Sequence, residues 1–179
     1  GTGAGRQVTL VEHSEGVATL MNRLAQDDPE CKRLVEAARE HDQGKRVHGF
    51  QVLLHGDALR AAAGPPLAKS GLRSRRAQQA AWNRSRLPRG FRHEVFSLDY
   101  LDENDLLLRH LVATHHGYGR PWFPPLAGDA LGADRVHLKM GHAARFGELL
   151  NSMGPWRLAE LEMLLRASDI RRSIEEGNG

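Results

Sequence analysis

The chain has 179 residues, of which 40% are hydrophobic and 26% are charged, so it is long enough to bury one core and predicts a single domain over 1–179. It has 25 lysines and arginines against 22 aspartates and glutamates, a formal net charge of +3, and its one cysteine excludes a disulfide framework and favours the cytoplasm. No apolar run approaches the roughly 18 residues that a membrane span needs, which excludes a membrane-embedded protein.

Apolar residues at three- and four-residue spacing dominate the first part of the chain. They predict a helix over 8–26, with His13 on its apolar face. A second predicted helix starts near Pro29, carries His41 on its apolar stripe and stops at Gly44. Both histidines are therefore expected to point inward.

The rest of the chain is predicted to be helical as well, and no stretch alternates as a strand would. Glycines and prolines between 117 and 125 interrupt the pattern, as is typical of a loop. The predicted helices cover 50–63, 77–83, 92–101, 104–115, 134–152 and 155–174. We expect an all-α fold with no internal repeat and no second domain.

A basic insert over 64–90 differs in charge from the rest of the chain. It contains seven lysines and arginines and no acidic residue, and glycines and prolines bound it on both sides. Such a patch is typical of a protein that binds a polyanion, here through Arg73, Arg75 and Arg76, with Trp82 stacking on a base. A solvated connector that only keeps the chain soluble explains the composition equally well.

Ten histidines are many for this length, and several lie next to an acidic residue or to each other. The pair His41-Asp42 ends one predicted helix, and the pair His115-His116 ends another. Asp169 lies on an apolar helical stripe, where a carboxylate needs a cation as its partner. Each feature alone has a structural explanation, such as a helix-end histidine that interacts with the helix dipole. Together they favour a metal or acid–base site.

The order of these residues resembles the HD phosphohydrolase superfamily from about Thr9 to Ile174, nearly the whole chain. Within that superfamily the sequence is most similar to the HD nuclease domain of the CRISPR type I helicase-nuclease. An Arg-His-Glu phrase and two adjacent histidines separate this branch from dNTP triphosphohydrolases and cyclic-nucleotide phosphodiesterases. The phrases that carry the resemblance are Glu12-His13-Ser14, His41-Asp42-Gln43-Gly44-Lys45, Phe91-Arg92-His93-Glu94, Ala113-Thr114-His115-His116-Gly117 and Ser168-Asp169-Ile170.

The resemblance implies a helical HD-domain bundle around two divalent metal ions. One ion would be held by His13, His41, Asp42 and Asp169. The other would share Asp42 as a bridge and add His93, His115 and His116. Imidazole ligands suit Mn²⁺, Fe²⁺, Co²⁺ or Ni²⁺ better than Mg²⁺, which stays an alternative. Two cations on a bridging carboxylate can activate a water for in-line attack on phosphorus.

Residues beside the implied ligands have two interpretations each. Lys45 could act with Asp42 in catalysis by stabilising negative charge in the transition state, or be an ordinary solvated lysine. Arg92 and Arg120 could guide the DNA backbone, with Tyr118 and Trp122 as stacking faces, although packing within the loops explains these four equally well. The remaining histidines have no place in the pattern and are expected to be structural or on the surface: His48, His55, His110, His137 and His142.

The function that the resemblance implies is metal-dependent cleavage of single-stranded DNA in CRISPR antiviral defence, with endonuclease or exonuclease action left open. The implied partners are a helicase that feeds single-stranded DNA and the DNA-targeting surveillance complex. Because the chain has no G-x-x-x-x-G-K-[ST] loop, the helicase would be a separate protein or a further part of a longer chain, as the start at Gly1 without methionine suggests. The alternatives are an HD phosphohydrolase that acts on nucleotides or cyclic nucleotides, and a non-catalytic nucleic-acid-binding module with a structural metal.

Overall fold

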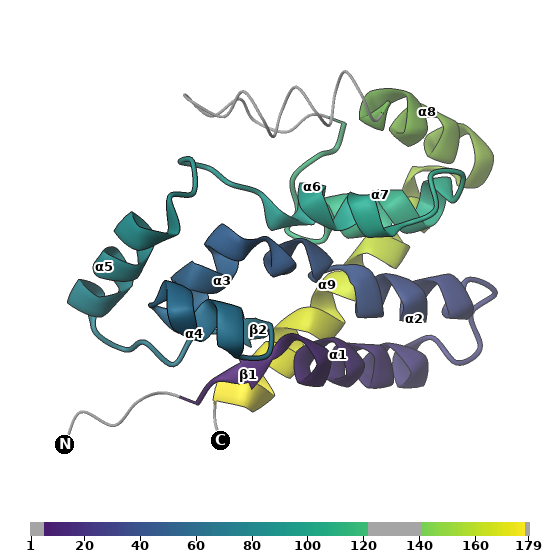
Figure 1. Cartoon of the computed structure of the whole chain (residues 1–179). Coiled ribbons are helices and arrows are strands. Elements are labelled where there is room, and N and C mark those ends of the chain that lie inside the picture. The colour runs from purple at the N-terminus through teal and green to yellow at the C-terminus, as the bar shows by residue number, and fades with distance from the viewer. Residues whose placement is uncertain (1–5, 122–140, 178–179) are drawn as a thin grey trace.

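The computed structural model of the chain describes residues 6–121 and 141–177 (Figure 1). Within these ranges the chain forms nine α-helices, two short 3-10 helices and two short strands, which confirms the predicted helical class. In chain order the elements are β1 (Val8–Thr9), α1 (Leu10–Leu24), α2 (Cys31–Glu40), η1 (Gln43–Arg46), α3 (His48–His55), α4 (Ala58–Ala63), β2 (Leu67–Lys69), α5 (Arg75–Ser85), α6 (His93–Ser97), η2 (Leu98–Tyr100), α7 (Leu106–Thr114), α8 (His142–Met153) and α9 (Pro155–Gly177).

The main core lies between α1, α2, α7 and α9. Figure 1 shows α1 and α2 side by side, with α7 above them and the long α9 crossing behind. On α1 the buried residues recur at three- and four-residue spacing, so the buried His13 lies on the same face as Val17 and Met21. The fully buried residues of the other three helices include Leu34, Leu111, Leu161 and Leu165.

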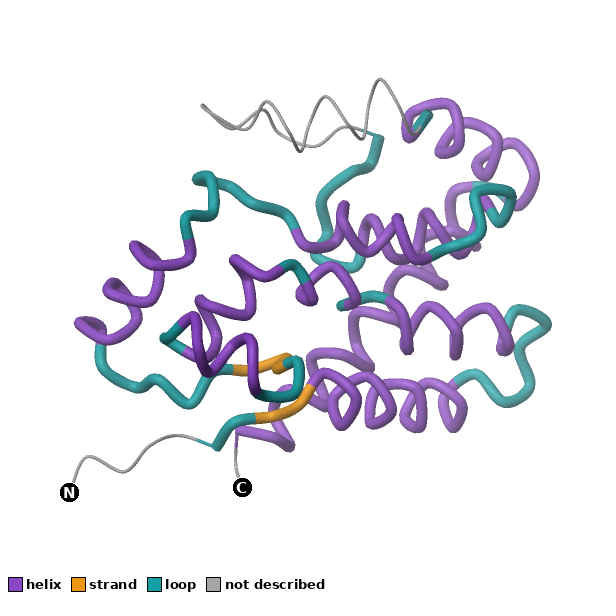
Figure 2. The backbone as a smooth tube through the Cα atoms, viewed as in Figure 1, coloured by secondary structure: helices purple, strands orange, loops and turns teal. Residues whose placement is uncertain are grey.

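Two short strands correct the prediction that the chain has none. Val8 pairs with Lys69 and Thr9 with Leu67 in an antiparallel ladder, drawn in orange in Figure 2. The predicted helix therefore begins two residues late, at Leu10, where Thr9 Oγ1 accepts a hydrogen bond from the Glu12 amide at 3.1 Å. Strands of two and three residues are too short to show an alternating pattern in the sequence.

The helix predicted over 50–63 is two helices in the structure. Gly56 adopts a left-handed conformation, with φ of 77°, which ends α3, and Asp57 then caps α4 through the amides of Leu59 and Arg60. The segment predicted as one helix over 92–101 is likewise divided into α6 and η2. Residues 134–140 of another predicted helix lie outside the described residues.

The basic insert over 64–90 is an ordered part of the fold where it was predicted to be a loop with a short helix. It contains β2, which pairs with β1, and α5, which packs against α3. Gly49 of α3 permits the close approach, because a Cβ there would lie 2.7 Å from the Ser85 carbonyl oxygen. In Figure 1, α5 forms the edge of the molecule opposite α8.

Across the part of the chain that the structure describes, no helix combines the length and the apolar character needed to span a bilayer.

Candidate metal centre

The structure brings all seven predicted ligands to one place in the core. They come from five segments that are distant in sequence: α1, the end of α2, the start of α6, the end of α7 and the C-terminal half of α9. Figure 1 shows these segments converging near the middle of the molecule. The residues are His13, His41, Asp42, His93, His115, His116 and Asp169.

Asp42 lies between two sets of imidazole rings. Its Oδ2 atom is 3.4 Å from His41 Nε2 and 3.6 Å from His13 Nε2, and its Oδ1 atom is 2.9 Å from His93 Nε2 and 3.9 Å from His115 Nε2. The carboxylate is only 2% exposed. One oxygen therefore faces each set, which is the arrangement that a bridging ligand requires.

The two sets are compact enough to hold metal ions. The donor atoms of His13, His41 and Asp42 lie within 4.8 Å of one another, and so do those of a second set, His93, His115 and His116. We call them the first group and the second group. Asp169 belongs with the first group, because its Oδ1 atom is 3.1 Å from His13 Nε2 and 3.9 Å from His41 Nε2.

Backbone hydrogen bonds fix the tautomer of two of these histidines. His41 Nδ1 donates to the Ala38 carbonyl oxygen at 2.8 Å, and His115 Nδ1 donates to the Val112 carbonyl oxygen at 2.7 Å. Each bond leaves Nε2 unprotonated with its lone pair directed at the site. Both Nε2 atoms are buried and have no hydrogen-bond partner among the described residues, an arrangement that normally costs free energy. A metal ion would satisfy both atoms, so the donor set fits one.

The charges of the site match the protonation state that metal binding requires. Burial lowers the pKa of His41, and burial together with the imidazole of His41 lowers the pKa of His115 well below its usual value. Burial raises the pKa of Asp42, but Lys45, His41 and the hydrogen bond with His93 together outweigh that effect and hold the pKa well below its ordinary value. His41 and His115 are thus held neutral, and the Asp42 carboxylate is held ionised.

The metal-free protein is expected to lose stability to acid through these histidines. An unfolded histidine takes up a proton near pH 6.5, whereas His41 and His115 resist protonation in the fold. Because the unfolded state binds more protons below this pH, each of the two lowers the free energy of unfolding by up to about 1.4 kcal/mol for every pH unit of further acidification. Urea unfolding in EDTA between about pH 7.5 and pH 5.5 measures the slope. His115→Gln should reduce it and the exposed His48→Gln should not; equal slopes in all three proteins would contradict the prediction.

Lys45 lies beside the first group. Its Nζ atom is 2.6 Å from Asp42 Oδ2, and the side chain is 14% exposed. A second hydrogen bond, of 3.4 Å, runs from Nζ to the carbonyl oxygen of Ala68 in β2. The ammonium group is thus held at the bridging carboxylate, within reach of any anion that binds there.

Ser97 and Gly44 hold α6 against the turn that carries Asp42. Ser97 Oγ accepts from the Gly44 amide at 2.8 Å and donates to the His41 carbonyl oxygen at 2.7 Å. A Cβ on Gly44 would lie 1.9 Å from the His93 carbonyl oxygen, so only glycine permits this contact. These contacts place His93 within hydrogen-bonding distance of Asp42.

The structure places the predicted nucleic-acid-binding arginines in three different settings. Arg73, Arg75 and Arg76 are exposed at and before the start of α5. Arg92 is largely buried, with Nη1 3.3 Å from Glu94 and the guanidinium 5.0 Å from the ring centre of Tyr118. Arg120 Nε is 3.0 Å from Glu162 of α9. Trp82 is half-buried on α5, and Trp122 lies outside the described residues.

The histidines expected to be structural or on the surface fall into both classes. His55 Nε2 lies 3.2 Å from the Pro65 carbonyl oxygen, and among the described residues His55 forms no hydrogen bond with a residue of either group. His110 is buried against Glu162, with Nε2 and Oε1 2.6 Å apart, and His142 is buried against the Gly119 carbonyl oxygen. His48 is exposed, and His137 lies outside the described residues.

Glu176 is the site residue that the sequence analysis missed. Its carboxylate contacts His13 Nδ1 at 2.9 Å from the last turn of α9. The predicted helix ended at 174, which left Glu176 in a polar tail. The signal that could have found it is the i, i+7 spacing of Asp169 and Glu176, which places two acidic residues on one face of a helix.

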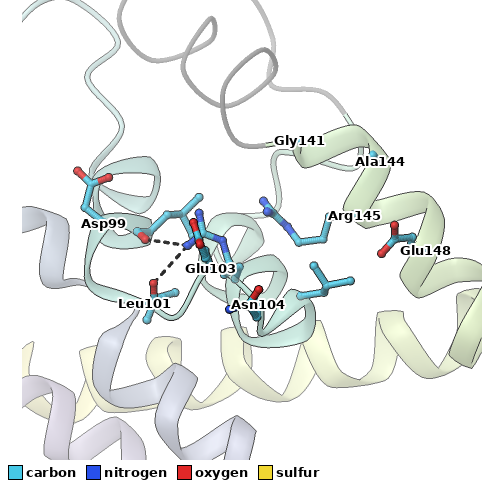
Figure 3. Close-up of a pocket in the computed structure, with 11 residues that line it drawn as sticks. Asp99, Leu101, Glu103, Asn104, Gly141, Ala144, Arg145 and Glu148 are labelled. Carbon is cyan, nitrogen blue, oxygen red and sulfur yellow. Dashed lines mark hydrogen bonds between the residues drawn. The ribbon is translucent and has the colours of Figure 1, made fainter.

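A cavity of about 560 Å³ lies away from the metal groups, between η2, α7 and α8 (Figure 3). Its lining includes Arg109, Arg145, Glu103 and Glu148, and none of the seven predicted ligands. Burial and the proximity of Arg109 lower the pKa of Arg145 to about 10. The residues of the first group are instead buried among the helices, whereas His116 of the second group is exposed.

Comparison of the chain with protein-family models, with curated proteins and with solved structures found no match.

Proposed function

We propose that the chain is a metal-dependent phosphodiesterase that cleaves single-stranded DNA. The observation that carries the proposal is a buried carboxylate whose two oxygens face two histidine groups, with two buried imidazole nitrogens that lack a partner among the described residues. Two divalent ions bridged by one carboxylate are a recurrent solution for hydrolysing phosphodiesters. The residues that would hold them are those of the first group with Asp169, and those of the second group with Asp42.

The bound ions would supply Lewis-acid stabilisation of the phosphate oxygens and a water activated for attack. The protein's own residues orient the ligands and neutralise charge. His41 and His115 present fixed nitrogens because their Nδ1 protons are held by backbone carbonyls. Lys45 keeps Asp42 ionised and offers a positive charge for a substrate phosphate. The imidazole-rich donor set favours Mn²⁺, Ni²⁺, Co²⁺ or Fe²⁺ over Mg²⁺.

The nuclease activity is tested with circular single-stranded DNA, which has no ends. We expect nicking and linearisation with Mn²⁺, Ni²⁺ or Co²⁺, slower cleavage with Mg²⁺, and none in EDTA. Metal binding without any cleavage of the circle, but with hydrolysis of a nucleotide or cyclic nucleotide, would replace the proposal with a small-molecule phosphohydrolase. Loss of the fold in EDTA without hydrolysis of either substrate would indicate a structural metal.

The basic insert is proposed to bind the DNA strand near the site. Reversing the charge of Arg73, Arg75 and Arg76 to glutamate should weaken single-stranded DNA binding and reduce its salt dependence, because each lost phosphate contact lowers the slope of log K against log salt by about 0.7. Fluorescence anisotropy at several salt concentrations measures both quantities.

The matched control changes the net charge by the same amount elsewhere. Arg23, Arg33 and Arg39 are exposed on α1 and α2, and their reversal should leave the salt slope near that of the wild type. If the two triple variants bind DNA equally well, the insert is not the DNA-binding surface.

The cellular setting of this proposal is CRISPR type I interference in the cytoplasm. A nuclease for single strands needs the duplex opened, and the chain carries no P-loop of its own, so a helicase domain or subunit and a surveillance complex are the partners proposed for it.

A further inference from the structure

Glu176 lies on the side of His13 that faces away from Asp42. Its two carboxylate oxygens are 2.9 and 3.1 Å from His13 Nδ1, while the other ring nitrogen, Nε2, is 3.6 Å from Asp42 and 3.1 Å from Asp169. The Glu176 side chain is 1% exposed although it lies in the last turn of α9. The imidazole is therefore held between Glu176 and the carboxylates of the site.

Two cationic side chains hold Glu176 in this position. Lys69 Nζ, from β2 of the basic insert, is 2.8 Å from Oε2 and also donates to the Ser173 carbonyl oxygen at 3.1 Å. Arg172 Nε is 2.7 Å from Oε1. Gly16 makes room for this arginine, because a Cβ on Gly16 would lie 2.2 Å from Arg172 Nε. Both oxygens of the buried carboxylate are thus hydrogen-bonded on more than one side.

The contact between His13 Nδ1 and the Glu176 carboxylate differs from those that orient His41 and His115. Those two rings donate from Nδ1 to neutral backbone carbonyls one helical turn earlier. A carboxylate in the same role is a stronger acceptor, since a hydrogen bond to an ionised group is roughly twice as strong as a neutral one, and it raises the basicity of the opposite nitrogen. Among the described residues, His13 Nδ1 has no backbone carbonyl as its partner and contacts the Glu176 carboxylate instead, so Glu176 supplies the orientation of the ring.

We propose that Glu176 is a positioning residue for the first group. By accepting the Nδ1 proton of His13, it directs the Nε2 lone pair at the position shared with His41, Asp42 and Asp169. Lys69 and Arg172 keep the carboxylate in place. The proposal rests on the proposed metal centre, and it gives the basic insert a role in metal binding through Lys69 that is separate from DNA binding.

The test is a titration of the full chain with Mn²⁺, in which electron paramagnetic resonance counts the free ion. Glu176→Ala should weaken one of the two binding steps by about 10–100-fold, the usual cost of losing such an outer partner, and leave the other unchanged. Glu176→Gln keeps a neutral acceptor and should lose less. Lys69→Met should weaken the same step. The exposed neighbour Glu175→Ala is the matched control.

Reference variants assign the step that is lost. His41→Ala removes a ligand of the first group and His115→Ala removes one of the second, so Glu176→Ala should reproduce the first pattern. Unchanged affinities, or an equal loss at both steps, would overturn the positioning role while leaving the metal centre in place. Absence of Mn²⁺ binding by the wild-type chain would overturn the metal centre itself, and the positioning role with it.

A second measurement observes directly which nitrogen of the His13 ring carries the proton. Nitrogen NMR of histidine-labelled, Zn²⁺-loaded protein should show the His13 proton on Nδ1 and the metal on Nε2. In Glu176→Ala, the Nδ1 resonance should shift and its proton should exchange faster with water. If Glu176 only stabilises the end of α9, the unfolding temperature will fall while the His13 signals stay as in the wild type, and the proposal is wrong.

Discussion

Asp42→Asn is expected to abolish metal binding at both groups and to reduce DNA cleavage by about a thousandfold or more, equivalent to about 4 kcal/mol of transition-state stabilisation. The reason is that Asp42 belongs to the first group, which Oδ2 faces, and lies against the second group through Oδ1. An amide of the same shape has no charge to share between two cations, and its NH2 group would point a donor at one set of imidazoles.

Thermal unfolding separates this loss from misfolding. At a Mn²⁺ concentration 100 times the dissociation constant, each bound ion should stabilise the wild type by about 2.7 kcal/mol, which corresponds to a rise of about 5–11 °C in Tm for a chain of this size. Asp42→Asn should show the same circular dichroism without metal and almost no rise with it. The exposed Asp27→Asn is the control and should behave as the wild type. Cleavage or a metal-induced rise in Tm that survives in Asp42→Asn would rule out the bridging role.

Gly44→Ala is expected to be the most destabilising single-methyl change near the site. The added Cβ would lie 1.9 Å from the His93 carbonyl oxygen and 2.7 Å from the Ser97 amide nitrogen, both of which are backbone atoms of α6. Ordinary contact needs about 3.4 Å, so α6 must move away from η1. Overpacking of this kind costs about 3 kcal/mol, or a loss of about 6–12 °C in Tm.

The same displacement of α6 should weaken metal binding at the second group more than at the first. His93 begins α6 and moves with it, whereas His13 and His41 belong to other helices. Urea unfolding and a Mn²⁺ titration measure the two effects. Gly147→Ala on α8 is the matched control, because its Cβ meets nothing within 4 Å, and it should stabilise the helix by about 0.5–1 kcal/mol. Equal stability of the two variants would show that α6 can move away from η1 without lowering the free energy of unfolding.

Local patterns were sufficient to predict most helices and the inward direction of the site residues. The apolar stripe of α1 includes His13, and that of α2 leads to His41, so a 3.6-residue period locates both rings in the core. The helical period does not predict the elements that depend on tertiary contacts or on a special backbone conformation. The strand at Val8 exists because residue 69 pairs with it, and the break at Gly56 depends on a backbone conformation that a helical pattern does not reveal.

The side chains that could hold metal were predictable from the sequence, but the groups that orient them were not. The seven predicted ligands are recognisable by order and residue type, and the structure brings them together. The pairing of His13 with Glu176, and of Glu176 with Lys69, joins residues far apart in sequence through side chains that local patterns mark only as polar. Which oxygen of Asp42 faces which ring is likewise a property of packing, set by the Ser97 and Gly44 contacts.

The long sequence separation within the site has a consequence for synthesis of the chain. His13 contacts Asp169 across 156 residues and Glu176 across 163. A nascent chain that has released only its first eight helices from the ribosome still lacks the acidic residues of α9, so it holds an incomplete ligand set. Closing so long a loop costs entropy that a bound ion would help to offset. The first group is therefore completed only when α9 has been synthesised and has packed against α1.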